Sequence, residues 1–146
     1  MAIIIYRWTA CGALPPSLAL ALQAIMREVL LNTELIAVNQ DAGPNVGASR
    51  VAVTACAPGA PQSCQLWHKT NSTGAHFVAV YNPNGAGTRN GTFAVPFAAL
   101  GLPPGTAAAV RDLWAHADMG VFTDSYTATE IAPFEARTLR IVAMGA

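Results

Sequence analysis

Charged side chains are scarce in this chain. Only 11% of its 146 residues are Asp, Glu, Lys or Arg, and the eight acidic and eight basic residues cancel to a formal net charge of zero. A surface that holds nucleic acid or an anionic membrane needs clustered basic residues to meet the phosphates. We therefore expect no nucleic-acid partner and no membrane partner.

Long uninterrupted apolar runs are also missing. The best candidate for a membrane span, residues 18–31, contains Gln23, Arg27 and Glu28 and is shorter than the roughly 20 residues that a spanning helix needs. The first apolar run, residues 2–6, is shorter than the hydrophobic region of a signal peptide, and no basic residue precedes it. We expect neither a transmembrane helix nor a signal peptide in this chain.

Patterns that bind metals, phosphates or cofactors are lacking. His68 and His76 are eight residues apart, His116 is remote, and no Cys/His spacing matches a zinc ligand set. The glycine-rich stretch at residues 84–87 reads as a hairpin turn, because no helix pattern and no Lys-Ser or Lys-Thr pair follows it. We expect no metal site and no cofactor.

Cysteines are few but suggestively placed. Cys56 and Cys64 bracket a turn rich in Pro and Gly, so a disulfide between them would close a hairpin loop and stabilise the fold by roughly 2–3 kcal/mol in the entropic model. We favour this disulfide over two free thiols. Cys11 is then left over, and an odd cysteine in a chain that otherwise reads as secreted suggests a lost partner.

Two N-glycosylation sequons also indicate a secreted protein. Asn71-Ser72-Thr73 and Asn90-Gly91-Thr92 both fall in turn-rich stretches, where an attached oligosaccharide would stand in solvent. Together with the disulfide, they predict that the protein enters the secretory pathway and is extracellular, vacuolar or lysosomal.

A helical segment is predicted near the N-terminus. Pro15 and Pro16 precede Ser17, a good N-cap, and residues 18, 22, 25 and 29 are apolar at helical spacing. The helix is expected to end near residues 32–34, before a short apolar run at 35–38. Residues 1–41 therefore form an N-terminal segment.

From residue 50 the hydrophobic period changes from helical to two. Turn clusters separate eight strand-like runs, at residues 50–54, 65–70, 76–81, 92–97, 107–114, 120–123, 125–131 and 136–144. Short strands at this spacing predict an antiparallel Greek-key β-sandwich over residues 50–146. The chain is thus expected to be mainly β, with one preceding helix.

Two stretches of this sequence resemble the α-galactosidases, the melibiases of glycoside hydrolase family 27. Residues 102–123, LPPGTAAAVRDLWAHADMGVFT, are similar to a signature near the C-terminus of that family. Residues 30–41, LLNTELIAVNQD, resemble its LTNKEVIAVNQD segment. The two occur in the family's order and at about its separation. The resemblance implies the last helix of a (β/α)8 barrel followed by the C-terminal β-sandwich, with the catalytic barrel upstream.

The resemblance also implies a reaction, the retaining hydrolysis of terminal α-linked galactose. A retaining glycosidase needs two carboxyl groups about 5 Å apart, and the family places two aspartates in Lys-Tyr-Asp-like and Trp-Asn-Asp-like contexts. Neither context occurs in this sequence. We read Asp41 as a cap or turn residue, and Asp112 and Asp118 as hydrogen-bonding turn residues. We expect no catalytic residue in this chain and no activity from it alone.

Carbohydrate binding without catalysis remains open. Trp67, Tyr81 and Trp114 are candidates for a sugar platform, although the resemblance implies that both tryptophans pack in the sandwich. Three hypotheses follow: a C-terminal part of a hydrolase, an independent carbohydrate-binding module, and a structural or interaction domain.

Overall fold

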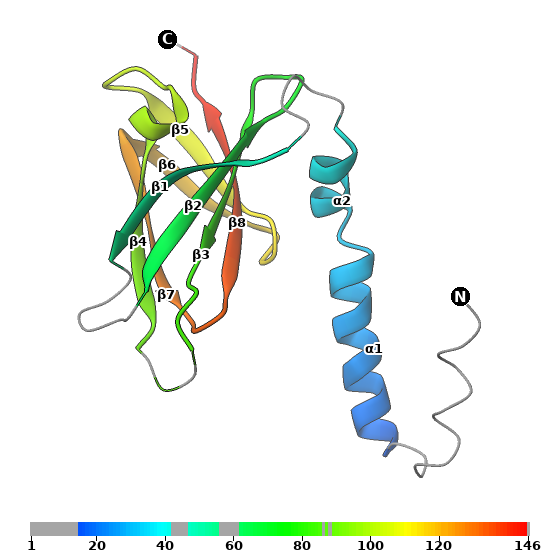
Figure 1. The fold of residues 1–146 in the computed structure, drawn as a ribbon. Helices are drawn as coiled ribbons and strands as arrows, with labels where there is room; N and C mark the ends of the chain where they lie inside the picture. Colours follow the sequence, from blue (N-terminus) through cyan, green and yellow to red (C-terminus); the bar gives the residue numbers. More distant parts are fainter. Residues whose placement is uncertain (1–14, 42–46, 56–61, 86, 88, 146) are drawn as a thin grey trace. The chain divides into compact units, whose positions relative to one another are not determined.

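The computed structural model describes residues 15–41, 47–55, 62–85, 87 and 89–145. The chain divides into two compact units, Met1–Ile36 and Ala37–Ala146. The second unit is an antiparallel β-sandwich (Figure 1), which confirms the predicted fold class.

The predicted helix is present, but it begins and ends differently. Helix α1 spans Pro16–Leu30, and its N-cap is Pro15, with no side-chain cap. Ser17 is therefore not the cap that the sequence predicted. Pro16 lacks an N–H group, so a proline at the first helical position removes one donor that would otherwise need a partner.

A second helix was missed by the sequence analysis. Helix α2 spans Thr33–Gln40, where only a short apolar run was expected. The side-chain oxygen of Asn32 accepts a hydrogen bond from the backbone N–H of Leu35 at 3.0 Å, which caps the new helix, and Glu34 lies in its first turn. Local capping thus divides the helical segment at residues 31–32.

Among the described residues, eight strands follow, one for each predicted run. They are β1 (Ser49–Ala55), β2 (Ser63–Thr70), β3 (His76–Tyr81), β4 (Gly91–Pro96), β5 (Ala107–Asp112), β6 (Ala117–Thr123), β7 (Ser125–Ile131) and β8 (Ala136–Ala143). Six form a sheet in the order β1-β2-β3-β8-β5-β6, and β4 pairs with β7 in the second sheet. All pairs are antiparallel.

The largest error in the predicted strands lies around residues 115–119, which were expected to form a turn. Strand β6 instead begins at Ala117, because the register shifts between Val110 and Arg111, which brings Arg111 opposite Asp118. The Arg111 guanidinium then pairs with the Asp118 carboxylate at 3.0 Å. Asp118 is consequently a strand residue.

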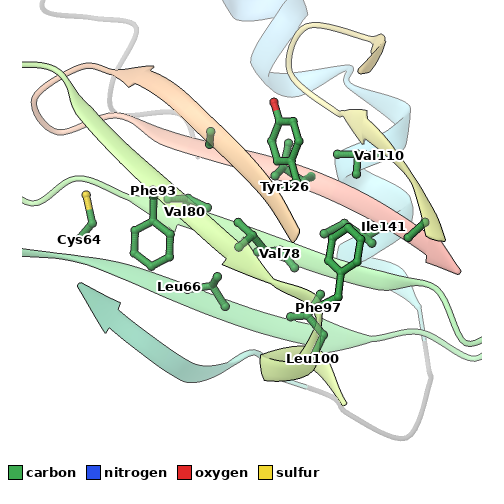
Figure 2. Packing of buried hydrophobic residues seen from close by; sticks show 14 of the residues in the cluster. Cys64, Leu66, Val78, Val80, Phe93, Phe97, Leu100, Val110, Tyr126 and Ile141 are labelled. Atoms are coloured by element: carbon green, nitrogen blue, oxygen red, sulfur yellow. The ribbon is translucent and has the colours of Figure 1, made fainter. Parts of the chain in front are cut away.

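The inner faces of the two sheets form one apolar core (Figure 2). Phe93 of β4 and Phe97 of the 3-10 helix η2 (Phe97–Leu100) are its largest fully buried side chains. They pack with alternate residues of the large sheet, such as Leu66, Val78 and Ile141. The period of two puts these residues on one face, and their burial drives the two sheets together.

Between β6 and β7 the chain passes from one sheet to the other at a single residue, Asp124. Its φ angle of 64° lies in the left-handed region. Its backbone N–H donates to the carbonyl of Thr106, and its own carbonyl accepts from Phe97 N–H at 2.8 Å. Its carboxylate also accepts from Gly105 N–H at 2.6 Å. Asp124 therefore ties the ends of β4, β5, β6 and β7 together.

The buried Asn82, which follows β3, holds the connection between β7 and β8. Asn82 is fully buried, and its side-chain N–H donates to the carbonyl of Ile131 at 3.0 Å. Its side-chain oxygen accepts from the backbone and side chain of Asn84, at 3.1 and 2.9 Å. Asn84 in turn exchanges two hydrogen bonds with the backbone of Gln62. One polar network thus adds to the two backbone hydrogen bonds by which Asn82 joins Phe134 and Glu135.

We expect Asn82→Ala to lower the free energy of unfolding by about 2–4 kcal/mol, because it leaves buried donors and acceptors without partners. Urea denaturation followed by circular dichroism measures this. The matched control is Asn90→Ala, at an exposed asparagine, which should change stability by less than about 0.5 kcal/mol. Equal effects of the two substitutions would contradict the role assigned to Asn82.

Candidate functional site

A groove lies where the turn between β5 and β6 meets the start of β8. Trp114 and Met119 line it, and both side chains are exposed, by 37% and 41%. Ala115, Ala117 and Ala136 complete its apolar lining. Small side chains at three positions leave room beside the indole ring of Trp114.

Three charged side chains form the polar lining of the groove. Arg137 Nη2 lies 3.0 Å from Glu135 Oε1, and its Nε lies 3.7 Å from Asp112 Oδ2. Its Nη1 donates to the carbonyl of Thr129 at 2.9 Å. Glu135 Oε2 accepts from Ala132 N–H at 2.7 Å. These contacts fix the orientation of one guanidinium and two carboxylates along the groove.

Asp112 also sets the position of Trp114. Its Oδ1 accepts hydrogen bonds from the backbone N–H groups of Trp114 and Ala115, at 2.9 and 3.0 Å. This side-chain turn holds the backbone of Trp114 while its ring stays half-exposed. The interpretation of Asp112 as a hydrogen-bonding turn residue agrees with this geometry.

The charged groups lie close to the edge of the core. Burial raises the pKa of Tyr126, with smaller and opposed contributions from Arg137, which lowers it, and Asp112, which raises it. Tyr126 packs edge-on against Phe122, with ring centroids 5.0 Å apart. Tyr126 therefore lies within electrostatic range of the polar wall of the groove.

Asp41, outside the groove, makes structural hydrogen bonds. The Asp41 side chain accepts from Ser72 N–H and Ser72 Oγ, at 3.1 and 3.0 Å. The ammonium of Lys69, which is buried, donates to the carbonyls of Val38 and Asp41. A cation thus meets the negative end of α2, and Asp41 joins the NQD motif to the turn between β2 and β3.

Comparison with known proteins identifies the family. The domain described as the alpha galactosidase C-terminal beta sandwich domain matches residues 61–141, more than half of the chain. The chain belongs to this family of α-galactosidase C-terminal domains. The match covers β2 to β8 up to Ile141, and it therefore includes every residue of the groove.

Whole relatives of this family are much longer than the chain. A probable alpha-galactosidase of Dictyostelium discoideum is 29% identical over 105 residues, which cover 72% of this chain and 25% of that protein. Alpha-galactosidase I of Mortierella vinacea shares the fold with a TM-score of 0.66 and 22% identity, over 82% of this chain and 29% of its own. The chain thus spans about a quarter of these relatives.

A third relative differs in its named substrate. A family 27 β-L-arabinopyranosidase of Geobacillus stearothermophilus has a TM-score of 0.62 and 23% identity, over 79% of this chain and 23% of its own. At this identity the likeness concerns the fold. The same C-terminal sandwich fold therefore accompanies enzymes that are named for different sugars.

The α-galactosidase-like sandwich places both candidate tryptophans differently from the expectation. Trp67 and Trp114 were expected to pack in the core, but they are 36% and 37% exposed. Trp67 is an outward residue of β2, since Cys64 and Leu66 on the opposite face of the strand are buried in the core. The core is filled from the other face, by phenylalanine and aliphatic side chains.

The three sugar-platform candidates do not form one surface of three rings. Trp67 and Tyr81 lie on paired strands, opposite Ala79 and Gln65. Trp114 instead belongs to the groove. Sequence reasoning missed Glu135 and Arg137 as its companions, because they follow Trp114 by more than 20 residues and no local motif joins them.

The predicted disulfide and glycosylation sites remain predictions. Cys64 is fully buried in the core, and Cys56 and Cys11 lie outside the described residues. Asn71 is half-buried, and its side-chain oxygen accepts from Thr73 and Ala75. Asn90 is exposed and donates to Glu130 at 2.8 Å. Of the two sequons, Asn90 is thus the more open to solvent.

The fold brings together His68 and His76, which are eight residues apart in the sequence. The hairpin of β2 and β3 brings His68 Nε2 to 2.9 Å from His76 Nδ1, with nearly stacked rings. Thr70 Oγ1 lies 3.3 Å from the same His68 nitrogen.

Among the described residues, no three His, Cys, Asp or Glu side chains gather as metal ligands would. Neither described helix is long and apolar enough to cross a bilayer.

We expect the histidine pair to make stability depend on pH. Burial lowers the pKa of both His68 and His76 below the ordinary 6.5, and His76 lowers that of His68 further. The unfolded chain therefore binds more protons below pH 6.5, so stability should fall as the pH drops below that value through the lowered pKa values. Urea denaturation at several pH values measures the slope.

A substitution within the pair tests this prediction. His76→Asn should flatten the pH dependence, because it removes one of the two imidazoles whose pKa is lowered. A slope that survives His76→Asn would show that other groups cause it.

Proposed function

We propose that this chain is the C-terminal sandwich of a larger glycoside hydrolase that removes terminal non-reducing α-D-galactose with retention. The observation that carries this proposal is the family match over residues 61–141. The named activities of the relatives support it, and the chain corresponds to only a quarter of such a protein. The upstream part would then be the catalytic (β/α)8 barrel.

The reaction itself requires residues that we assign to that upstream part. A retaining hydrolase needs a nucleophilic carboxylate and an acid/base carboxyl about 5–5.5 Å apart. In the sandwich, Asp41, Asp112 and Asp124 accept backbone hydrogen bonds, and Asp118 pairs with Arg111. Their engagement in turns and pairs supports the inference that the chain alone is inactive.

Helix α1 also supports an upstream partner. Its apolar stripe consists of Leu18, Leu22, Ile25 and Val29, which are exposed by 38–60%, and none of the helix's residues is buried. Water-exposed aliphatic side chains at helical spacing are typical of a surface that packs against another element. We assign this stripe to the barrel, as its last helix.

The localisation and modifications of the parent belong to the same proposal. We infer passage through the secretory pathway, a Cys56–Cys64 disulfide and glycosylation at Asn71 and Asn90. The support is the buried position of Cys64 and the position of Asn90 at the surface. A stand-alone carbohydrate-binding module is the second candidate function, favoured by the half-exposed rings of Trp67 and Trp114.

A chromogenic α-galactoside tests the assignment of catalysis. We expect the purified chain to release no chromophore above the buffer rate, because the two carboxylates that the groove brings together, Asp112 and Glu135, are both engaged by Arg137 and by backbone N–H groups. Asp112→Asn and Asp118→Asn are the informative variants. Turnover by the wild-type chain that either substitution abolishes would overturn the proposal.

The size of the native protein tests the assignment to a longer chain. An antibody against the sandwich, used on extracts of the source organism, should detect a band several-fold heavier than 15.2 kDa. Because 105 matched residues make up only 25% of the Dictyostelium relative, that protein is about three times as long as this chain. A band of such a size is expected to carry the α-galactosidase activity. A band at 15.2 kDa, apart from glycans, would favour the stand-alone module.

A further inference from the structure

We propose that the groove between Trp114 and Arg137 is a binding site for a neutral monosaccharide or sugar terminus. It lies within the sandwich and contains no residue that we place in hydrolysis. The inference goes beyond the proposed hydrolysis and deepens the second candidate function, carbohydrate binding, on which it rests. Binding and hydrolysis are measured separately, so a failure of sugar binding is distinguished from a failure of the assignment to a hydrolase.

The indole of Trp114 supplies the apolar surface of such a site. Sugar rings have one face of C–H groups, which packs on an exposed aromatic side chain, while their hydroxyl groups point outward from the ring. Trp114 is fixed through its backbone by Asp112, so its ring is held in place without being covered. The alanine side chains beside it leave space for a ring to lie on the indole.

The polar wall supplies hydrogen-bonding groups of both kinds. Arg137 offers a planar set of N–H donors, and the partly exposed carboxylate of Glu135 has acceptor capacity beyond the bonds it makes. Asp112 is buried and holds the guanidinium of Arg137 in place. A vicinal diol presents donors and acceptors at adjacent atoms, which matches a guanidinium beside carboxylates. The mutual ion pairs hold these groups in place before a ligand arrives, which lowers the entropic cost of binding.

The net charge of the groove selects among sugars. Two carboxylates and one guanidinium carry a combined charge of −1, so a uronic or sialic acid would be repelled. A neutral hexose would not be. We therefore expect galactose to bind more tightly than galacturonate by at least about threefold at low salt.

The chain contains a matched control for the decisive residue. Trp67 and Trp114 are exposed almost equally, by 36% and 37%, but only Trp114 borders the groove. Replacing either by alanine removes the same number of atoms from a half-exposed position. Ala136→Leu is a further variant, because it adds atoms to the groove at an exposed site without removing any packing.

The experiment is a titration of the full 146-residue chain with galactose, followed by two-dimensional NMR of its amide and indole N–H groups. We expect saturable shifts at Trp114 and Arg137 with a Kd of about 2 mM, as the size of a hexose allows. Trp114→Ala and Ala136→Leu should each weaken binding at least about tenfold, Trp114→Tyr less than about fivefold, and Trp67→Ala less than about twofold.

Each other outcome overturns the proposal. No saturable shift with galactose up to about 50 mM would show that the groove binds no such sugar. Shifts centred on Trp67, or abolished by Trp67→Ala, would move any binding to the outer face of β2. Tighter binding of galacturonate than of galactose would contradict the charge argument.

Discussion

The packing of a two-stranded sheet against the six-stranded one is the contact on which the rest of this structure depends. Strands β4 and β7 cover the inner face of the large sheet, and Phe93, Phe97 and Tyr126 come from this smaller layer. Burial of their rings accounts for much of the apolar area that drives folding. The connections between the layers are short, and their backbone N–H and C=O groups still need hydrogen-bond partners.

Polar side chains provide hydrogen-bond partners for these backbone groups. Several of them are among the chain's few acidic residues. Asp124 ties four strand ends, Asp112 forms the turn before Trp114, and Asp41 joins the linker to the hairpin of β2 and β3. In a chain with eight acidic residues, such structural use leaves few carboxylates for chemistry. The low charge content and the structural use of these carboxylates together support the proposed lack of catalysis.

The groove shows how a structural device can also present a binding surface. Asp112, Glu135 and Arg137 form contacts that stabilise two turns, and the same contacts hold them in a fixed array beside Trp114. If the upstream barrel hydrolyses galactosides, a neutral-sugar site on the sandwich would retain substrate or product near the enzyme. The family's shared fold, found in enzymes named for galactose and for arabinopyranose, allows such surface sites to differ while the core stays the same.

The sequence by itself determined the family, through two local motifs, and the sandwich with one strand-like run for each described strand, because alternating apolar residues and turn residues are local signals. It failed at α2, where the Asn32 cap outweighed the apolar pattern, and at Ala117–Thr123, where a register shift set the start of β6. Only the tertiary structure decided that Trp67 and Trp114 are exposed, that His68 meets His76, and that Arg137 joins Trp114. These outcomes depend on strand order and register, which bring together residues that are far apart in sequence and that no local propensity can link.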